Sequence, residues 1–152
     1  MNKKLLLVAL LLISGTKEVR AEENQYKITY EYETRLTSYY PRKPIRPTGC
    51  GLGVEDFGVN ENGWYTYNGQ LVVATATNYL LNYGWRYADG VRLYNYYDNL
   101  ILNINGEDYE AIVLDSCGIC MTTGRVDLFV TDRDAIVDTL IIVKEVENEE
   151  MV

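Results

Sequence analysis

Apolar and polar residues alternate in several short segments of the chain, which is the pattern of half-buried β-strands. In residues 26–33, "YKITYEYE", the side chains of Tyr26, Ile28, Tyr30 and Tyr32 fall on one side and polar side chains on the other. A period of two is typical of a strand with one covered face. This segment therefore predicts a strand near the start of the folded region.

Asn-Gly pairs separate other strand-like segments. Residues 99–104, "NLILNI", alternate, Asn105-Gly106 follows, and residues 109–115, "YEAIVLD", return. Asn-Gly favours the tight turns of hairpins because both residues tolerate positive φ. The sequence "NENGWYTYNG" holds two more such pairs, and the β-branched run at residues 70–77 predicts a buried strand.

The remaining segments are short. Residues 124–130, "GRVDLFV", form another apolar stretch, and residues 139–146, "TLIIVKEV", predict a final strand. Residues 131–139, "TDRDAIVDT", predict a short helix that Thr131 caps. Residues 78–81 fit one helical turn, and the three prolines fall in a predicted long loop.

Many short strands with turn signals and few helices favour a small all-β barrel. Strands and helices do not alternate along the chain, which argues against a parallel doubly wound sheet. No repeat and no long linker divide the sequence, so a single folded domain is expected.

The N-terminal residues have the pattern of a signal peptide. Lys3 and Lys4 precede an apolar run at residues 5–13, and Ala21 offers a cleavage point. The run is far shorter than the ~20 residues that span a bilayer. We expect residues 1–21 to be removed and the mature chain to be exported without a membrane span. The expected organisation is a signal peptide (1–21), an N-terminal strand extension (22–35), a barrel domain (36–147) and an acidic tail (148–152).

Charge and composition exclude several functions. Without residues 1–21 the chain has 10 basic and 21 acidic residues, a net charge of 10 − 21 = −11, which disfavours nucleic acid as a partner. The sequence has no histidine, which rules out Ser-His-Asp and Cys-His catalysis and His-ligated zinc. Its 14 tyrosines suit strands, and tyrosine also lines carbohydrate grooves.

Three cysteines allow three interpretations. Cys117-Gly-Ile-Cys120 has redox-motif spacing, but it follows a hairpin rather than the strand–helix setting of thioredoxin. A zinc site of three cysteines and Asp115 is less favoured, because structural zinc usually takes two ligand pairs. A disulfide suits an exported chain. A bond from Cys50 to Cys117 or Cys120 would contribute about 4 kcal/mol by closing a long loop, and the pairing stays open.

Two aspartates lie in apolar surroundings. Asp115 ends the run "EAIVLD", and Asp127 stands between Val126 and Leu128. Burial raises a carboxyl pKa and keeps the group protonated, as a general acid requires. The alternative is that Asp127 caps a turn or pairs with Arg125.

The segments "TSYYP", "GQLVVATAT" and "LDSCGIC…GRVDLFV" together resemble double-psi β-barrel proteins of the bacterial cell wall. The nearest resemblance is to the three-aspartate domain family, which includes stationary-phase survival proteins and the barrel of lytic transglycosylase A. In that family Asp-Thr-Gly precedes Arg-(Ile/Val)-Asp-Leu-(Phe/Tyr), so that Asp115 and Asp127 occupy the two aspartate positions. "CGIC" and "TGCG" are also similar to segments of rare-lipoprotein-A and expansin barrels.

The resemblance implies a six-stranded double-psi β-barrel with one or two short helices, acting outside the cell on peptidoglycan glycan strands as a monomer. It implies a lytic transglycosylase activity without metal or cofactor, with Asp127 as the acid/base and Asp115 as its partner. The other residues expected to contact substrate are Tyr39, Tyr40, Thr75 and Arg125.

The sequence departs from the family pattern at two places. The segment "LVVATAT" has no acidic residue where the family has its first aspartate. The family's Asp-Thr-Gly-Gly is Asp-Ser-Cys-Gly in this chain. The alternative function is therefore an expansin-like module that binds wall polysaccharide without cleaving it.

Overall fold

The computed structural model describes residues 26–41 and 47–148. The expected signal peptide, residues 42–46 of the proline-containing loop and nearly all of the acidic tail lie outside the described residues. The chain divides into two units, residues 30–145 and residues 1–29 with 146–152. The candidate site described below belongs to the first unit.

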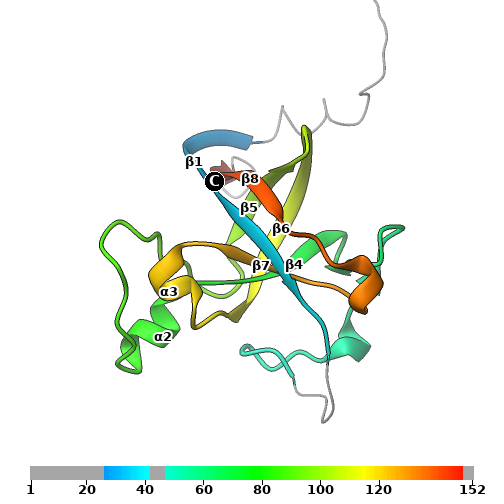
Figure 1. Ribbon diagram of the computed structural model, residues 1–152, viewed down its shortest axis with the longest axis horizontal. Coiled ribbons are helices and arrows are strands. Elements are labelled where there is room, and N and C mark those ends of the chain that lie inside the picture. The colour runs from blue at the N-terminus through cyan, green and yellow to red at the C-terminus, as the bar shows by residue number, and fades with distance from the viewer. Residues whose placement is uncertain (1–25, 42–46, 149–152) are drawn as a thin grey trace, which may run out of the picture. The chain divides into compact units, whose positions relative to one another are not determined.

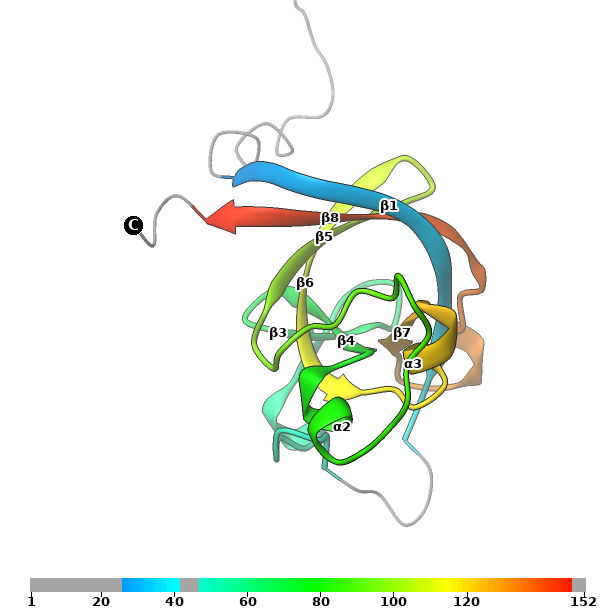
Figure 2. The same ribbon diagram turned by 90° about the vertical axis from the view of Figure 1, so that its left-hand side faces the viewer.

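Six strands form a closed barrel (Figures 1 and 2). They are β1 (Tyr26–Tyr39), β4 (Gln70–Thr75), β5 (Asn99–Ile104), β6 (Glu107–Ser116), β7 (Val126–Phe129) and β8 (Thr139–Asn148). Their hydrogen-bonded order is β4-β6-β5-β8-β1-β7, and the pairing of β7 with β4 completes the ring. The predicted small all-β barrel is thus confirmed.

The other elements are short. Strands β2 (Gly58–Val59) and β3 (Tyr65–Tyr67) extend the sheet beside β4, and the two short helices are α2 (Asn78–Asn82) and α3 (Cys120–Thr123). Two 3-10 turns, η1 (Val54–Asp56) and η2 (Arg133–Ala135), lie in connections.

Two strand pairs in the barrel are parallel, β1 with β7 and β4 with β6. The pairings β4–β7, β5–β6 and β5–β8 are antiparallel. Parallel neighbours need a connection that crosses over, whereas a tight turn can join only antiparallel ones. The mixed pairing agrees with the crossing connections expected of a double-psi barrel.

Two of the three predicted Asn-Gly pairs form turns with positive φ at both residues, whereas at Asn62-Gly63 only Gly63 has positive φ. Asn105 and Gly106 have φ of 54° and 89° between β5 and β6, and Asn68 and Gly69 have φ of 52° and 84° between β3 and β4. These positive angles match the turn that fits the right-handed twist of hairpin strands. The turns therefore set the register of both hairpins.

Alternation along the strands fills the barrel with aliphatic side chains. Those that point inward from the six strands include Leu36, Leu71, Val73, Leu100, Leu102, Val113, Val126, Leu128, Ile141 and Val143. On the outer surface, Val72, Leu114 and Phe129 form a second cluster with residues of the 50–57 segment and β3. The outer side of β4, β6 and β7 is consequently covered rather than open to water.

The predicted short helix near residue 131 is the 3-10 turn η2, and its cap differs from the expectation. Asp132 accepts a hydrogen bond from the Asp134 amide. The Thr131 hydroxyl instead donates to the carbonyl of Gly63 at 2.9 Å. Thr131 therefore ties η2 to the turn before Trp64 and is not its cap.

Candidate active site

The two aspartates lie in one row across the barrel wall. Ala74 on β4 pairs with Asp115 on β6 at one side and with Asp127 on β7 at the other. Thr37 on β1 pairs in turn with Asp127. Residues paired across neighbouring strands point to the same face of a sheet, and strands are about 4.8 Å apart. The Cα atoms of the two aspartates are thus separated by about 10 Å across two strand spacings.

A register shift brings Asp115 into this row. Val73 pairs with Val113, but Ala74 pairs with Asp115, so β6 holds one extra residue between the two pairs. Regular alternation from Val113, which points inward, would also turn Asp115 inward. The bulge rotates Asp115 to the outer face, beside Ala74. Bulges re-aim side chains in this way and occur often next to functional sites.

Three donors hold the Asp115 carboxylate. The backbone amides of Gly49 and Ser116 donate to Oδ1 at 2.8 and 2.9 Å. The Tyr39 hydroxyl donates to Oδ2 at 3.2 Å. Asp115 therefore joins β1, β6 and the loop at Gly49 at a single point.

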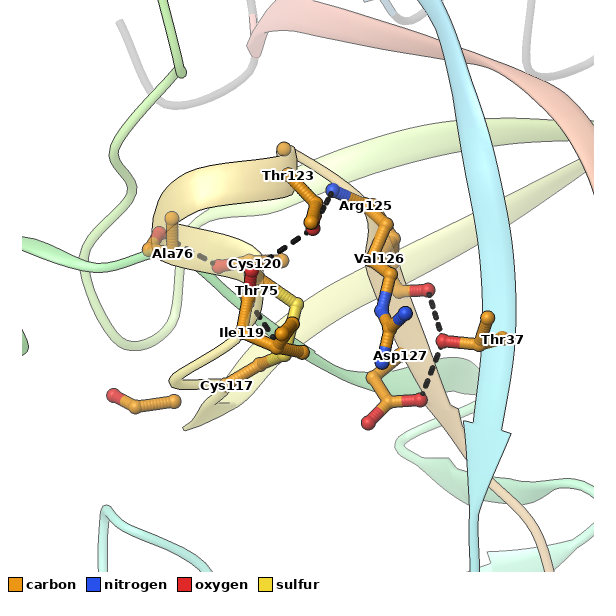
Figure 3. Close-up of a disulfide and its surroundings, with 12 residues drawn as sticks. Thr37, Thr75, Ala76, Cys117, Ile119, Cys120, Thr123, Arg125, Val126 and Asp127 are labelled. Carbon is orange, nitrogen blue, oxygen red and sulfur yellow. Dashed lines mark hydrogen bonds between the residues drawn. A yellow bond between two sulfur atoms is a disulfide. The ribbon is translucent and has the colours of Figure 1, made fainter. Parts of the chain in front are cut away.

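Asp127 is held much less tightly (Figure 3). Among the described residues, the donor that reaches it is the Thr37 hydroxyl, at 2.8 Å from Oδ1. Its other carboxylate oxygen has no hydrogen bond within the described part of the chain. The carboxyl is half-buried, and this second oxygen is free of the hydrogen bonds that fix Asp115.

Arg125 lies two residues before Asp127 on the same strand side. Its positive charge lowers the pKa of Asp127, yet the two side chains form no ion pair in the described structure. The Arg125 Nε is buried and lacks a hydrogen-bond partner among the described residues. The alternative that Asp127 serves only as the ion-pair partner of Arg125 therefore finds no support in the geometry.

Burial raises the pKa of both aspartates above their ordinary 3.8. The three donors oppose this rise at Asp115, and Thr37 and Arg125 oppose it at Asp127. The negative charge of Asp115 adds to the rise at Asp127. Burial, with both carboxylates nearby, also raises the Tyr39 pKa well above 10, which keeps its hydroxyl protonated as a donor.

A second set of hydroxyls extends the site beyond Asp115. The Ser116 hydroxyl shares hydrogen bonds of 2.7 Å with the hydroxyls of Thr77 and Tyr96. The amide of Ser116 donates to Asp115, so this group is continuous with the carboxylate. Two carboxyls with raised pKa and a neighbouring hydroxyl network can donate, accept and relay protons.

The structure brings some of the predicted residues together and separates others. Tyr39 and Arg125 lie beside the aspartates, whereas Tyr40 packs against the barrel-core cluster. Thr75 is 1% exposed, and its hydroxyl donates to the carbonyl of Ala76.

Sequence reasoning missed five residues: Thr37, Gly49, Thr77, Tyr96 and Ser116. Thr37 had a usable signal, because it is two residues from Tyr39 in an extended segment and so shares its face. Gly49 and Tyr96 come from loops whose path the sequence pattern does not determine.

The disulfide joins Cys117 to Cys120, and Cys50 is a free, half-buried cysteine. Its Sγ lies 3.4 Å from the Thr48 hydroxyl. The bond from Cys50 that would have tied the proline loop to the aspartate segment is therefore absent. A four-residue loop constrains the unfolded chain less, so the expected contribution falls from about 4 to about 2 kcal/mol.

The disulfide packs behind the site. With Met121 it contacts Ala74 and Ala76 of the β4 segment, and Leu80 and Leu81 of α2 pack on the same cluster. The bond, shown in Figure 3, therefore fixes the chain directly after residues 115 and 116.

Within residues 26–41 and 47–148, no group of three or more Cys, Asp or Glu side chains is arranged to hold a metal ion. In the same part of the chain, none of the helices has the length and apolar character needed to cross a membrane. Comparison with family models, curated proteins and solved structures gives no match.

Proposed function

We propose that the protein is an exported, wall-associated enzyme of the lytic transglycosylase type, with Asp127 as general acid and base. The observation that carries the proposal is the pairing of Asp115 and Asp127 through Ala74, which places both carboxyls on the same outer face of the barrel. The resemblance of residues 115–129 to the three-aspartate family supports it, as does the signal-peptide pattern. The raised pKa of Asp127 agrees with acid catalysis.

In this reaction the Asp127 carboxyl gives its proton to the glycosidic oxygen as the bond from that oxygen to C1 breaks. The sugar's C6 oxygen then bonds to C1, and the C6 hydroxyl proton passes to the Asp127 carboxylate. The acid is regenerated, no water is consumed, and the product is a 1,6-anhydro sugar. Asp127 suits both steps because one of its oxygens has no hydrogen bond in the described structure.

Asp115 assists through its charge. Its carboxylate is fixed by three donors and raises the pKa of Asp127. Negative charge at this position also stabilises the positive charge that develops on the sugar ring in the transition state. Arg125 acts through its positive charge, which lowers the pKa of Asp127.

The second candidate is an expansin-like module that binds wall polysaccharide without cleaving it. One observation favours it: a cavity of about 330 Å³ lies away from both aspartates, lined by residues of β1, the 88–92 segment and the end of α3. A binder does not need a cleft at the carboxylates.

Digestion of purified peptidoglycan separates the two functions. The mature protein should release anhydro-muropeptides, which mass spectrometry identifies, and Asp127→Asn should not. Asp138→Asn is the matched control, because Asp138 is an exposed carboxylate that pairs with Arg35 outside the site. Co-sedimentation with the wall and no anhydro product from the unmodified protein would instead establish the binding module.

A further inference from the structure

Aromatic side chains gather on the surface of α2 and the loop that follows it. Tyr79, Tyr83, Trp85 and Tyr87 are 44%, 71%, 48% and 45% exposed. Exposed aromatic rings in such density have a cost in water and mark surfaces that contact a ligand. Trp85 packs on Gly118 beside the disulfide, whereas catalysis by the aspartates does not require Tyr79, Tyr83 or Tyr87.

Three tyrosines form a row that leads from this surface to the candidate active site. The ring centroids of Tyr83 and Tyr79 are 4.9 Å apart, and those of Tyr79 and Tyr96 are 5.4 Å apart. The Tyr96 hydroxyl then bonds the Ser116 hydroxyl, whose residue donates its amide to Asp115. The row is therefore continuous with the carboxylate.

The local structure holds this row in place. Tyr79 and Tyr83 are four residues apart, which puts them on the same side of a helical turn. The Thr77 hydroxyl accepts from the Leu80 amide as the cap of α2 and also bonds the Ser116 hydroxyl. The base of the tyrosine row is thus attached to the end of β6, where Asp115 lies.

The chemistry of the row fits a neutral sugar chain. A tyrosine ring offers a flat apolar face for the C–H groups of a pyranose and a hydroxyl at its edge for the sugar hydroxyls. The whole chain has a net charge of −8, which disfavours a polyanion. Adjacent rings are tilted by 53° and 40°, so successive sugars of a twisted strand could each meet one ring.

We propose that Tyr83, Tyr79 and Tyr96 are saccharide subsites that guide a glycan strand toward Asp115. The proposal rests on the proposed function for its ligand class, a 1,4-linked amino-sugar strand. It assigns the row to binding and leaves the chemistry to the aspartates.

The test uses binding rather than turnover. In the Asp127→Asn background, N-acetylglucosamine oligosaccharides and soluble muropeptide strands are titrated by calorimetry. Tyr83→Ala should weaken affinity about fivefold or more, because it removes one stacking face. Tyr83→Phe keeps the ring and should stay within about twofold of the parent. Leu140→Ala is the control, since Leu140 is 55% exposed on β8 and lies outside both the row and the cavity beside β1.

The outcomes of the two proposals are distinguishable. Unchanged affinity in Tyr83→Ala, or no oligosaccharide binding by the parent, would overturn the tyrosine subsites even where wall digestion succeeds. Tyr83-dependent sedimentation with phosphatidylglycerol vesicles in place of sugar binding would overturn them too. Loss of sugar binding in Tyr83→Ala without any anhydro product would support the subsites and remove only the enzymatic proposal.

Discussion

Asp115 and Asp127 are paired through the same alanine, but their surroundings differ. Asp115 accepts hydrogen bonds from two backbone amides and a tyrosine, whereas Asp127 accepts one from Thr37 within the described structure. Backbone donors cannot be removed by a side-chain change and stabilise an ionised carboxylate. The comparison indicates that Asp115 is a fixed structural charge and Asp127 the carboxyl available for proton transfer.

The largest expected effect is on catalysis. Asp127→Asn should lower the rate of anhydro-muropeptide release about 100-fold or more, because an amide cannot supply the proton. Asp115→Asn should leave measurable activity but shift its pH dependence toward acid, since the Asp115 charge helps to raise the Asp127 pKa. Rates measured across pH for both variants check this, and equal losses would contradict the division of roles.

Loss of Asp115 should reduce the stability of the protein more than loss of Asp127, the reverse of their order in catalysis. Asp115→Ala leaves the amides of Gly49 and Ser116 and the Tyr39 hydroxyl without their acceptor, and we expect a loss of about 2 kcal/mol. Asp127→Ala removes one hydrogen bond and should lose about 1 kcal/mol or less. Urea unfolding gives both values, and a larger loss for Asp127 would make that residue the structural one.

Gly49→Ala perturbs the same carboxylate from the loop. A methyl group there would lie 3.1 Å from the Asp115 Oδ1 and would press on the Tyr96 hydroxyl. The loop must move away and lengthen the amide bond to Asp115, with an expected loss of about 1 kcal/mol. Gly69→Ala is unsuitable as a control because the φ of Gly69 is +84°, which strains any other residue. Ser116→Ala is used instead, because it removes the hydrogen bond to the Tyr96 hydroxyl and leaves the loop at Gly49 unchanged.

The two aspartates should contribute less to stability as pH rises through their transitions, whereas Glu145, whose pKa is lowered by its hydrogen bond from Arg92, contributes in the opposite direction. Both folded-state pKa values are raised, so between the unfolded pKa and the folded pKa the native state binds more protons than the unfolded state. Their contribution to the free energy of unfolding therefore falls as pH rises from about 3 to above the raised values. Asp127→Asn should flatten part of this decline in urea titrations, and an unchanged slope would show that Asp127 is not perturbed.

Thr37→Val should have the smallest effect. The Thr37 hydrogen bond lowers the Asp127 pKa, so its removal should raise that pKa further at nearly constant shape. The alkaline limb of the activity profile should move to higher pH, with a stability loss below about 1 kcal/mol. A shift toward acid would contradict the assignment of Asp127 as the titrating acid.

Much of the barrel could be predicted from local pattern. The Asn105-Gly106 hairpin, the buried strand at β4 and the final strand all follow from alternation and turn chemistry, which act over a few residues. The site was predicted only in its two aspartates, Tyr39 and Arg125. The Gly49 amide and the Tyr96 hydroxyl reach the site through long loops, and the bulge that turns Asp115 outward depends on how β4 and β6 pair.

The disulfide pairing also could not be predicted from local sequence pattern. The spacing of Cys117 and Cys120 permitted a bond, but the choice between them and Cys50 depends on where the loop at residues 47–57 lies. That path is fixed by contacts such as Leu52 and Val54 on the outer cluster, which no short-range pattern records.

Ala74 makes the aspartate separation a property of the main chain. Both aspartates pair with one residue of a central strand. Replacing a surface loop should therefore leave the distance between their Cα atoms unchanged. Ala74 is 2% exposed and packs with the disulfide cluster, so a bulkier residue at position 74 would press on both neighbouring strands. The spacing of the two acids therefore depends on a small residue in the barrel wall.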